Sequence, residues 1–144
     1  MVIIVGRLIG IDYGDARTGI AVSDPTGLLA VAVVTIHEKN IDILVKEIAD
    51  TIEKYETDEF VVGYPKDMMG NPGPRAVKTE RFAKKLQRET NIPVVLFDER
   101  YSTQTALQYL NATDTRGKKR KNILDTVSAA IILQDYMDMK KNLK

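Results

Sequence analysis

A carboxylate at the end of an apolar run constrains the fold of this chain more than any other feature of its sequence. Residues 9–24 read IGIDYGDARTGIAVSD, in which two apolar runs flank a short polar connection that contains two glycines. This pattern predicts a β-hairpin. Asp12 ends the first strand beside residues that we expect to be buried, although Asp is depleted in strands. Asp12 therefore either opens the turn through its side chain or belongs to a metal or phosphate site.

The first part of the chain predicts three strands, a helix and a fourth strand. Apolar, β-branched runs joined by short turns place the strands within residues 2–13, 17–24 and 28–36, as an antiparallel meander. From 41 to 55 the apolar residues recur at helical spacing. The short apolar run at 59–63 that follows is typical of a buried parallel strand.

The second part of the chain predicts a continuation of this α/β alternation. The expected elements are a loop over 64–74, a helix over 75–90, a strand over 92–97, a helix from 102 or 103 to 110, a basic stretch over 111–121 and a last helix over 122–139. Helical crossovers favour parallel strands placed beside the first strand. We therefore expect an α/β fold, a five-stranded mixed sheet of three antiparallel strands and then two parallel ones, flanked by helices. With 144 residues, the chain is expected to form one domain over 1–144.

Composition narrows the possible chemistry. The chain has no cysteine and one histidine, His37, which excludes disulfides, thiolate zinc sites and multi-histidine metal sites and disfavours a Ser-His-Asp triad. The apolar run at the N-terminus is too short for a signal peptide or a membrane span, so we expect a cytoplasmic protein with no membrane partner. Catalysis would have to come from carboxylates, hydroxyls, Lys, Arg and bound metal.

Three carboxylates are candidates for such a site. Ligands of parallel sheets bind outside the carboxyl ends of the strands, where Asp12 and Glu99 end the first and fifth strands, and Asp125 is expected in the first turn of the last helix. If the fold brings them together, they suit one or two Mg²⁺ or Mn²⁺ ions, which can activate water at a phosphodiester. Simpler interpretations are a surface salt bridge for Glu99 with Arg100 and a helix-dipole contact for Asp125.

A local concentration of positive charge precedes the last helix. Residues 116–121 carry five Lys and Arg side chains, although the net charge of the whole chain is only +1. Such a run either contacts a phosphate backbone or forms a solvated loop. The candidate nucleic-acid-binding residues are Arg17, Arg75, Arg100, Lys118, Lys119, Arg120 and Lys121.

Four motifs, which together span nearly the whole chain, resemble the YqgF/RuvX family. They are GIDYGxxRxGIAVSD at 10–24, VVGYPxxMxG at 61–70, DERYST at 98–103 and DTVSAAxILQ at 125–134. The resemblance implies an RNase H-like fold and the activity of a Holliday junction resolvase or of a nuclease that matures the pre-16S rRNA. The metal-binding acids of that family match Asp12, Glu99 and Asp125.

The leading hypothesis is a divalent-metal-dependent nuclease that acts on structured nucleic acid. It would process the 5′ end of pre-16S rRNA, resolve Holliday junctions in DNA recombination and repair, or do both, as a monomer or homodimer with one or two bound Mg²⁺ or Mn²⁺ ions. The main alternative is a non-catalytic, nucleic-acid-binding factor for ribosome assembly. A sugar kinase or actin-like ATPase, which also carries an Asp at a phosphate-binding hairpin, needs two copies of such a core, and this chain is too short for that.

Overall fold

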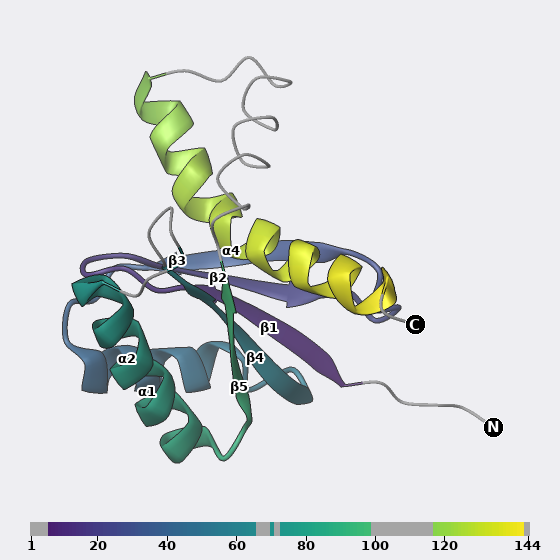
Figure 1. Cartoon of the computed structure of the whole chain (residues 1–144), viewed down its shortest axis with the longest axis horizontal. Helices are drawn as coiled ribbons and strands as arrows, with labels where there is room; N and C mark the ends of the chain where they lie inside the picture. Colours follow the sequence, from purple (N-terminus) through teal and green to yellow (C-terminus); the bar gives the residue numbers. More distant parts are fainter. Residues whose placement is uncertain (1–5, 66–69, 71–72, 99–116, 143–144) are drawn as a thin grey trace.

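The computed structural model describes residues 6–65, 70, 73–98 and 117–142, apart from the side chains of 117–126 and 142. Its elements are β1 (Arg7–Asp12), β2 (Thr18–Ser23), β3 (Ala30–Ile36), α1 (Ile41–Thr51), β4 (Thr57–Tyr64), α2 (Pro74–Thr90), β5 (Val94–Asp98) and α4 (Gly117–Asn142). The five strands form one sheet in the order β3-β2-β1-β4-β5. Helices α1 and α2 cover one face of this sheet, and the second half of α4 lies on the other (Figure 1).

The sheet confirms the predicted mixed topology. Strands β1 and β2 form the antiparallel hairpin, and β3 extends it on the far side of β2. Strand β4 then pairs with β1 in parallel, and β5 pairs with β4 in parallel. The two crossovers therefore return the chain to the first strand, which lies at the centre of the sheet.

The last helix is longer than the sequence predicts. It begins at Gly117, so the basic run from Lys118 to Lys121 forms its first turns and is not a loop. Asp125 consequently lies about two turns inside the helix. The interpretation of Asp125 as a helix-dipole contact in the first turn is therefore wrong. The physical reason is that Lys and Arg are good helix formers, and no proline interrupts them. The helix predicted to end at 110 lies outside the described residues.

Two hydrophobic cores hold the layers together. The core under α1 and α2 is built from bulky side chains of β1, β2, β4 and both helices, including Ile9, Phe60 and Phe82, which are fully buried. The core under α4 is smaller and contains Ala21, Val61, Ala129 and Leu133. No helix in the described part of the chain is long and apolar enough to cross a membrane.

A side chain of α4 also binds the outer edge of the sheet. Gln134 accepts a hydrogen bond from the backbone N–H of Ala30 (2.9 Å) and donates one to the carbonyl oxygen of Leu28 (3.0 Å). Both partners lie where the chain enters edge strand β3. The helix is therefore attached to the edge of the sheet as well as to its face.

Candidate active site at the carboxyl edge of the sheet

The parallel strands end together at one edge of the sheet. Ile11 is aligned with Val62 on β4, and the next residue of β4, Gly63, is aligned with Phe97 on β5. Asp12 is therefore level with Gly63 and Phe97, and the chain leaves β5 at Asp98 on the same edge. This edge is the one where an open α/β sheet offers a ligand site.

Asp12 belongs to the sheet face that α4 covers. Alternate residues of a strand share a face, and Ile9 and Ile11 belong to the core under α1 and α2. Gly10 faces α4, where an added Cβ would lie 2.7 Å from the carbonyl oxygen of Ala129 and 2.7 Å from Cβ of Leu133. The absence of a side chain at Gly10 thus lets α4 pack directly on β1, two residues before Asp12. Asp125 lies four residues, or about one helical turn, before Ala129.

The hairpin loop after Asp12 is fixed by packing. Tyr13 is buried and stacks on Phe82 of α2, with ring centroids 4.3 Å apart and ring planes 5° apart. Burial, and then the nearby Asp15 carboxylate, raise the pKa of Tyr13. Gly14 makes the tight loop possible, because a Cβ there would collide with the carbonyl oxygen of Arg17.

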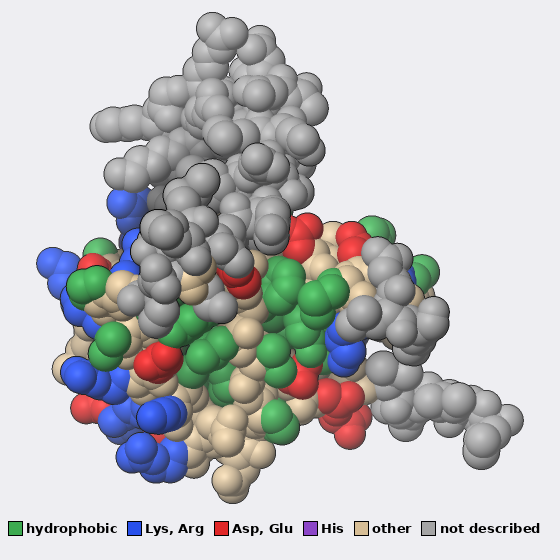
Figure 2. Space-filling view, viewed as in Figure 1, with side chains coloured by type: hydrophobic (Ala, Val, Ile, Leu, Met, Phe, Trp, Pro, Cys, Tyr) green, Lys and Arg blue, Asp and Glu red, His purple; other side chains and the backbone are tan. Residues whose placement is uncertain are grey.

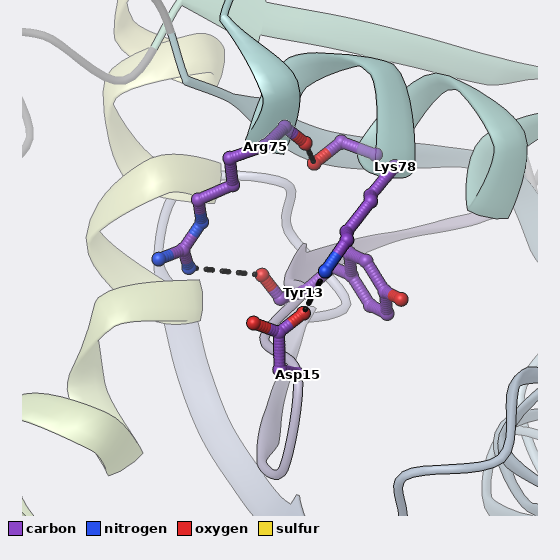
Figure 3. Close-up of polar contacts among 5 residues, drawn as sticks. Tyr13, Asp15, Arg75 and Lys78 are labelled. Atoms are coloured by element: carbon purple, nitrogen blue, oxygen red, sulfur yellow. Dashed lines mark hydrogen bonds and ion pairs between the residues drawn. The ribbon is translucent and has the colours of Figure 1, made fainter.

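Two cations of α2 contact this loop (Figure 3). The Nη2 of Arg75, in the first turn of α2, donates to the carbonyl oxygen of Tyr13 at 3.3 Å. One turn later, Nζ of Lys78 lies 3.5 Å from Oδ1 of Asp15, and both side chains are well exposed. Positive charge is therefore held against loop residues that lie one and three positions after Asp12. Lys78 was not singled out from the sequence, although its spacing of three residues from Arg75 is the helical signal that would have identified it.

The other predicted site residues are only partly within the described structure. Arg17 closes the hairpin loop before β2, and Lys118, Lys119, Arg120 and Lys121 form the first turns of α4. Glu99 and Arg100 lie outside the described residues. Among the residues that the structure does describe, no three His, Cys, Asp or Glu side chains are grouped as metal ligands; Glu99 and the Asp125 side chain are not among them.

Tyr64 at the end of β4 has a structural contact that its position in the loop did not reveal. Its hydroxyl donates to Oε1 of Glu80 on α2, and this hydrogen bond, followed by burial, raises the pKa of Tyr64. The contact attaches the end of β4 to α2. This contact gives Tyr64 a packing role.

Comparison with solved structures defines the class of fold. The chain is similar to Thermus thermophilus RuvC in complex with Holliday junction substrate, with a TM-score of 0.56, 13% identity and coverage of 94% of this chain and 96% of that one. It is also similar to the yeast mitochondrial Holliday junction resolvase Ydc2, with a TM-score of 0.50, 13% identity and coverage of 99% and 85%. The sheet order and these neighbours define an RNase H-like fold, as predicted.

Sequence comparison then identifies the family. Residues 6–139 match the model of the family described as "RuvX: Holliday junction resolvase", and the chain belongs to this family. A relative from Geobacillus sp. (strain WCH70) is 42% identical over 94% of this chain and 99% of its own length. A relative from Halothermothrix orenii is 43% identical over 95% of this chain and 98% of its own length. Both relatives carry the name "Putative pre-16S rRNA nuclease".

Proposed function

We propose that this protein is a divalent-metal-dependent nuclease that hydrolyses phosphodiester bonds in structured nucleic acid. One observation carries the proposal: Asp12 lies at the carboxyl edge of the sheet, on the face where Gly10 lets α4 pack against β1. The chain leaves β5 toward Glu99 at this edge, and Asp125 lies one helical turn before the Ala129 contact. Three carboxylates distant in sequence would therefore come together at one place.

The residues present fit a hard divalent cation. The described member of the set, Asp12, is a half-buried carboxylate at the end of a central strand, and the other two members also offer carboxylate oxygens, the ligands that Mg²⁺ and Mn²⁺ prefer. Asp12, Glu99 and Asp125 would hold one or two such ions. When bound, the ions would supply an activated water and charge stabilisation at the scissile phosphate.

Positively charged side chains around this edge would hold the nucleic acid. Arg75 is positioned by its bond to the Tyr13 carbonyl oxygen, close to Asp12, and Arg17 ends the same loop. Arg100, Lys118, Lys119, Arg120 and Lys121 would contact further phosphates. Such contacts set the register of a nucleic acid without reading its sequence.

The names of the relatives and the description of the family suggest two substrates. The sequence relatives support maturation of pre-16S rRNA, and the family description supports cleavage of a Holliday junction. Action on either substrate would fit a cytoplasmic protein. Symmetrical cleavage of a junction would require a homodimer, whereas trimming one RNA end would need only a monomer.

A cleavage panel tests the proposal. The native protein, Asp12→Asn and Asp15→Asn would each be incubated with Mg²⁺ or Mn²⁺ and a 5′-extended pre-16S rRNA, a four-way DNA junction or a plain duplex. Asp15 is the matched control, because it is an exposed acid of the same loop. We expect one structured substrate to be cleaved by the native protein and by Asp15→Asn, and cleavage to fall by at least about a hundredfold in Asp12→Asn.

The contrary outcomes are equally clear. Equal cleavage by Asp12→Asn would remove Asp12 from the site. Binding of the rRNA precursor without cleavage in either metal would favour the second candidate, a non-catalytic factor for ribosome assembly. The basic first turns of α4 would serve that role equally well.

A further inference from the structure

Helix α2 carries more positive charge than its packing requires. Its 17 residues include six Lys and Arg side chains and two Glu, whereas the net charge of the whole chain is +1. Five of the cations recur at helical spacing opposite the buried side, which is formed by Ala76, Thr79, Phe82, Ala83 and Leu86. We call these five the α2 basic face; they are Lys78, Arg81, Lys84, Lys85 and Arg88. Figure 2 shows Lys and Arg side chains gathered in this region.

Most of this charge is exposed, and much of it is unbalanced. Lys78 contacts Asp15, and Lys85 contacts Asp42 of α1. Arg81, Lys84 and Arg88 are exposed, and in the described part of the chain they have no carboxylate partner. Like charges three and four residues apart destabilise a helix. This arrangement therefore costs stability in the isolated protein and is better explained by an anionic partner.

The α2 basic face extends away from the candidate active site. Arg75 lies in the first turn of the helix, beside the hairpin of Asp12. From there α2 runs antiparallel to β5, toward the amino-terminal ends of the parallel strands. From Arg75 to Arg88 the helix rises about 20 Å. Lys84 and Arg88 border a pocket of about 730 Å³ between α2 and edge strand β5, which Val94 and Leu96 also line. The cations thus form a line that starts at the site, with open space beside its far end.

We infer that the α2 basic face is an extended contact surface for the phosphate backbone of the nucleic acid that the active site acts on. This inference rests on the proposed function. A regularly charged polymer fits the observation, because the cations are spaced along about 20 Å rather than gathered around a single anion. Each neutralised phosphate releases counterions, so such a surface contributes affinity that depends steeply on salt.

Equilibrium binding as a function of salt tests the inference. The triple variant Arg81→Gln/Lys84→Gln/Arg88→Gln would be compared with the native protein on a fluorescent four-way DNA junction and on a 5′-extended pre-16S rRNA fragment, without divalent metal. We expect affinity at 0.1 M salt to fall at least about tenfold and the slope of log K against log salt to shrink by roughly two to three. Circular dichroism would verify that the variant is folded.

A matched control separates local from total charge. The triple variant Lys39→Gln/Lys54→Gln/Lys141→Gln removes the same net charge from exposed positions outside α2. Its affinity should stay within about threefold of the native value, and its slope of log K against log salt should stay within about one unit of the native slope. Equal losses in both triple variants would show that net charge alone decides binding and would overturn the inference.

A variant of opposite sign gives an independent test. Asp42→Asn frees Lys85 from its carboxylate partner, so binding should strengthen about twofold to fivefold, and this gain should disappear in a Lys85→Gln background. An unchanged or weakened affinity in Asp42→Asn would contradict the assignment of Lys85 to the surface.

The inference and the proposed function can fail separately. If the native protein cleaves a substrate and the α2 triple variant binds it with unchanged affinity and slope, the basic face is wrong and the nuclease stands. If neither protein binds either nucleic acid, the proposed function fails first. If the triple variant loses only binding to phosphatidylglycerol vesicles and retains nucleic-acid binding, the partner is an anionic lipid surface and the inference is overturned.

Discussion

The two faces of the sheet are packed differently. On the face covered by α1 and α2, large side chains such as Phe60, Phe82 and Ile48 are fully buried and fill a deep core. On the face covered by α4, the helix also buries Ile132 and Leu133. Small residues lie at its closest approach to the strands, where a Cβ on Gly10 would meet the backbone of Ala129. Large side chains provide most of the burial free energy, whereas small ones allow the backbones to approach closely.

This difference assigns separate roles to the two layers. The α1 and α2 layer mainly stabilises the fold and fixes the hairpin loop through the stacking of Tyr13 on Phe82. The α4 layer mainly sets a distance, because the contact of Gly10 with Ala129 determines how close the helix carrying Asp125 comes to the strand carrying Asp12. Stability and site geometry should therefore respond to different substitutions.

The largest expected effect is on the side of the bulky core. Phe82→Ala removes a fully buried ring that stacks on Tyr13. The free energy of unfolding should therefore fall by about 3–5 kcal/mol. Urea denaturation measures this change. Val77→Ala, at a half-exposed position of the same helix, is the control and should change stability by less than about 0.5 kcal/mol. Similar small losses in both variants would contradict the assignment of the main core to this face.

On the α4 side, we expect a substitution to cost less stability than Phe82→Ala but to lower the activity of the folded protein. Gly10→Ala places a Cβ 2.7 Å from the Ala129 carbonyl oxygen and should cost about 1–3 kcal/mol, because α4 must move outward. Ile48→Val, in the opposite core, should cost about 0.5–1.5 kcal/mol and serves as the comparison. At a temperature where both variants are folded, cleavage should fall at least about tenfold only in Gly10→Ala. Equal activity in the two variants would refute the separation of roles.

The smallest expected effect concerns one hydrogen bond on the α4 side. The Tyr136 hydroxyl donates to Oε1 of Glu59 at 2.8 Å, so Tyr136→Phe should lower the free energy of unfolding by about 1 kcal/mol at neutral pH. Burial, and then the bond to Glu59, raises the pKa of Tyr136 from 10.0 to about 12.

The sign of the pH dependence follows from that pKa shift. The folded state holds the phenol proton more tightly than the unfolded state, so this contribution is complete below pH 10 and is lost as the pH rises from about 10 to about 12. The stability difference between the native protein and Tyr136→Phe should therefore shrink over this range. Tyr13 and Tyr64 remain in both proteins, so the difference isolates Tyr136. A difference independent of pH would contradict a raised pKa.

Local patterns predicted most of the fold. Two apolar runs on either side of a short, glycine-containing connection identified the hairpin around Asp12, and a change to helical spacing identified α1. The order of the elements then determined the mixed sheet. The same reasoning failed at the start of α4. Periodicity is visible only where apolar residues recur, and Lys118 to Lys121 form helical turns without any.

The candidate site was less predictable than the fold. The sequence placed Asp12 at the end of a strand, and the structure agrees. Gly10 packs against Ala129, and Tyr13 stacks on Phe82. Each pair joins residues that are far apart in the sequence. Such contacts exist only after the layers have packed, so no local pattern contains them.

The bond between Gln134 and the edge of the sheet bears on self-assembly. Leu28 and Leu29, directly before edge strand β3, and Val31 on the strand are more than half exposed. Such an apolar edge invites pairing with another copy of the chain. An incoming strand would find the N–H of Ala30 and the carbonyl of Leu28 already bound by one amide side chain. The protein can therefore expose an apolar edge near α4 and still resist growth into a continuous intermolecular sheet from that end.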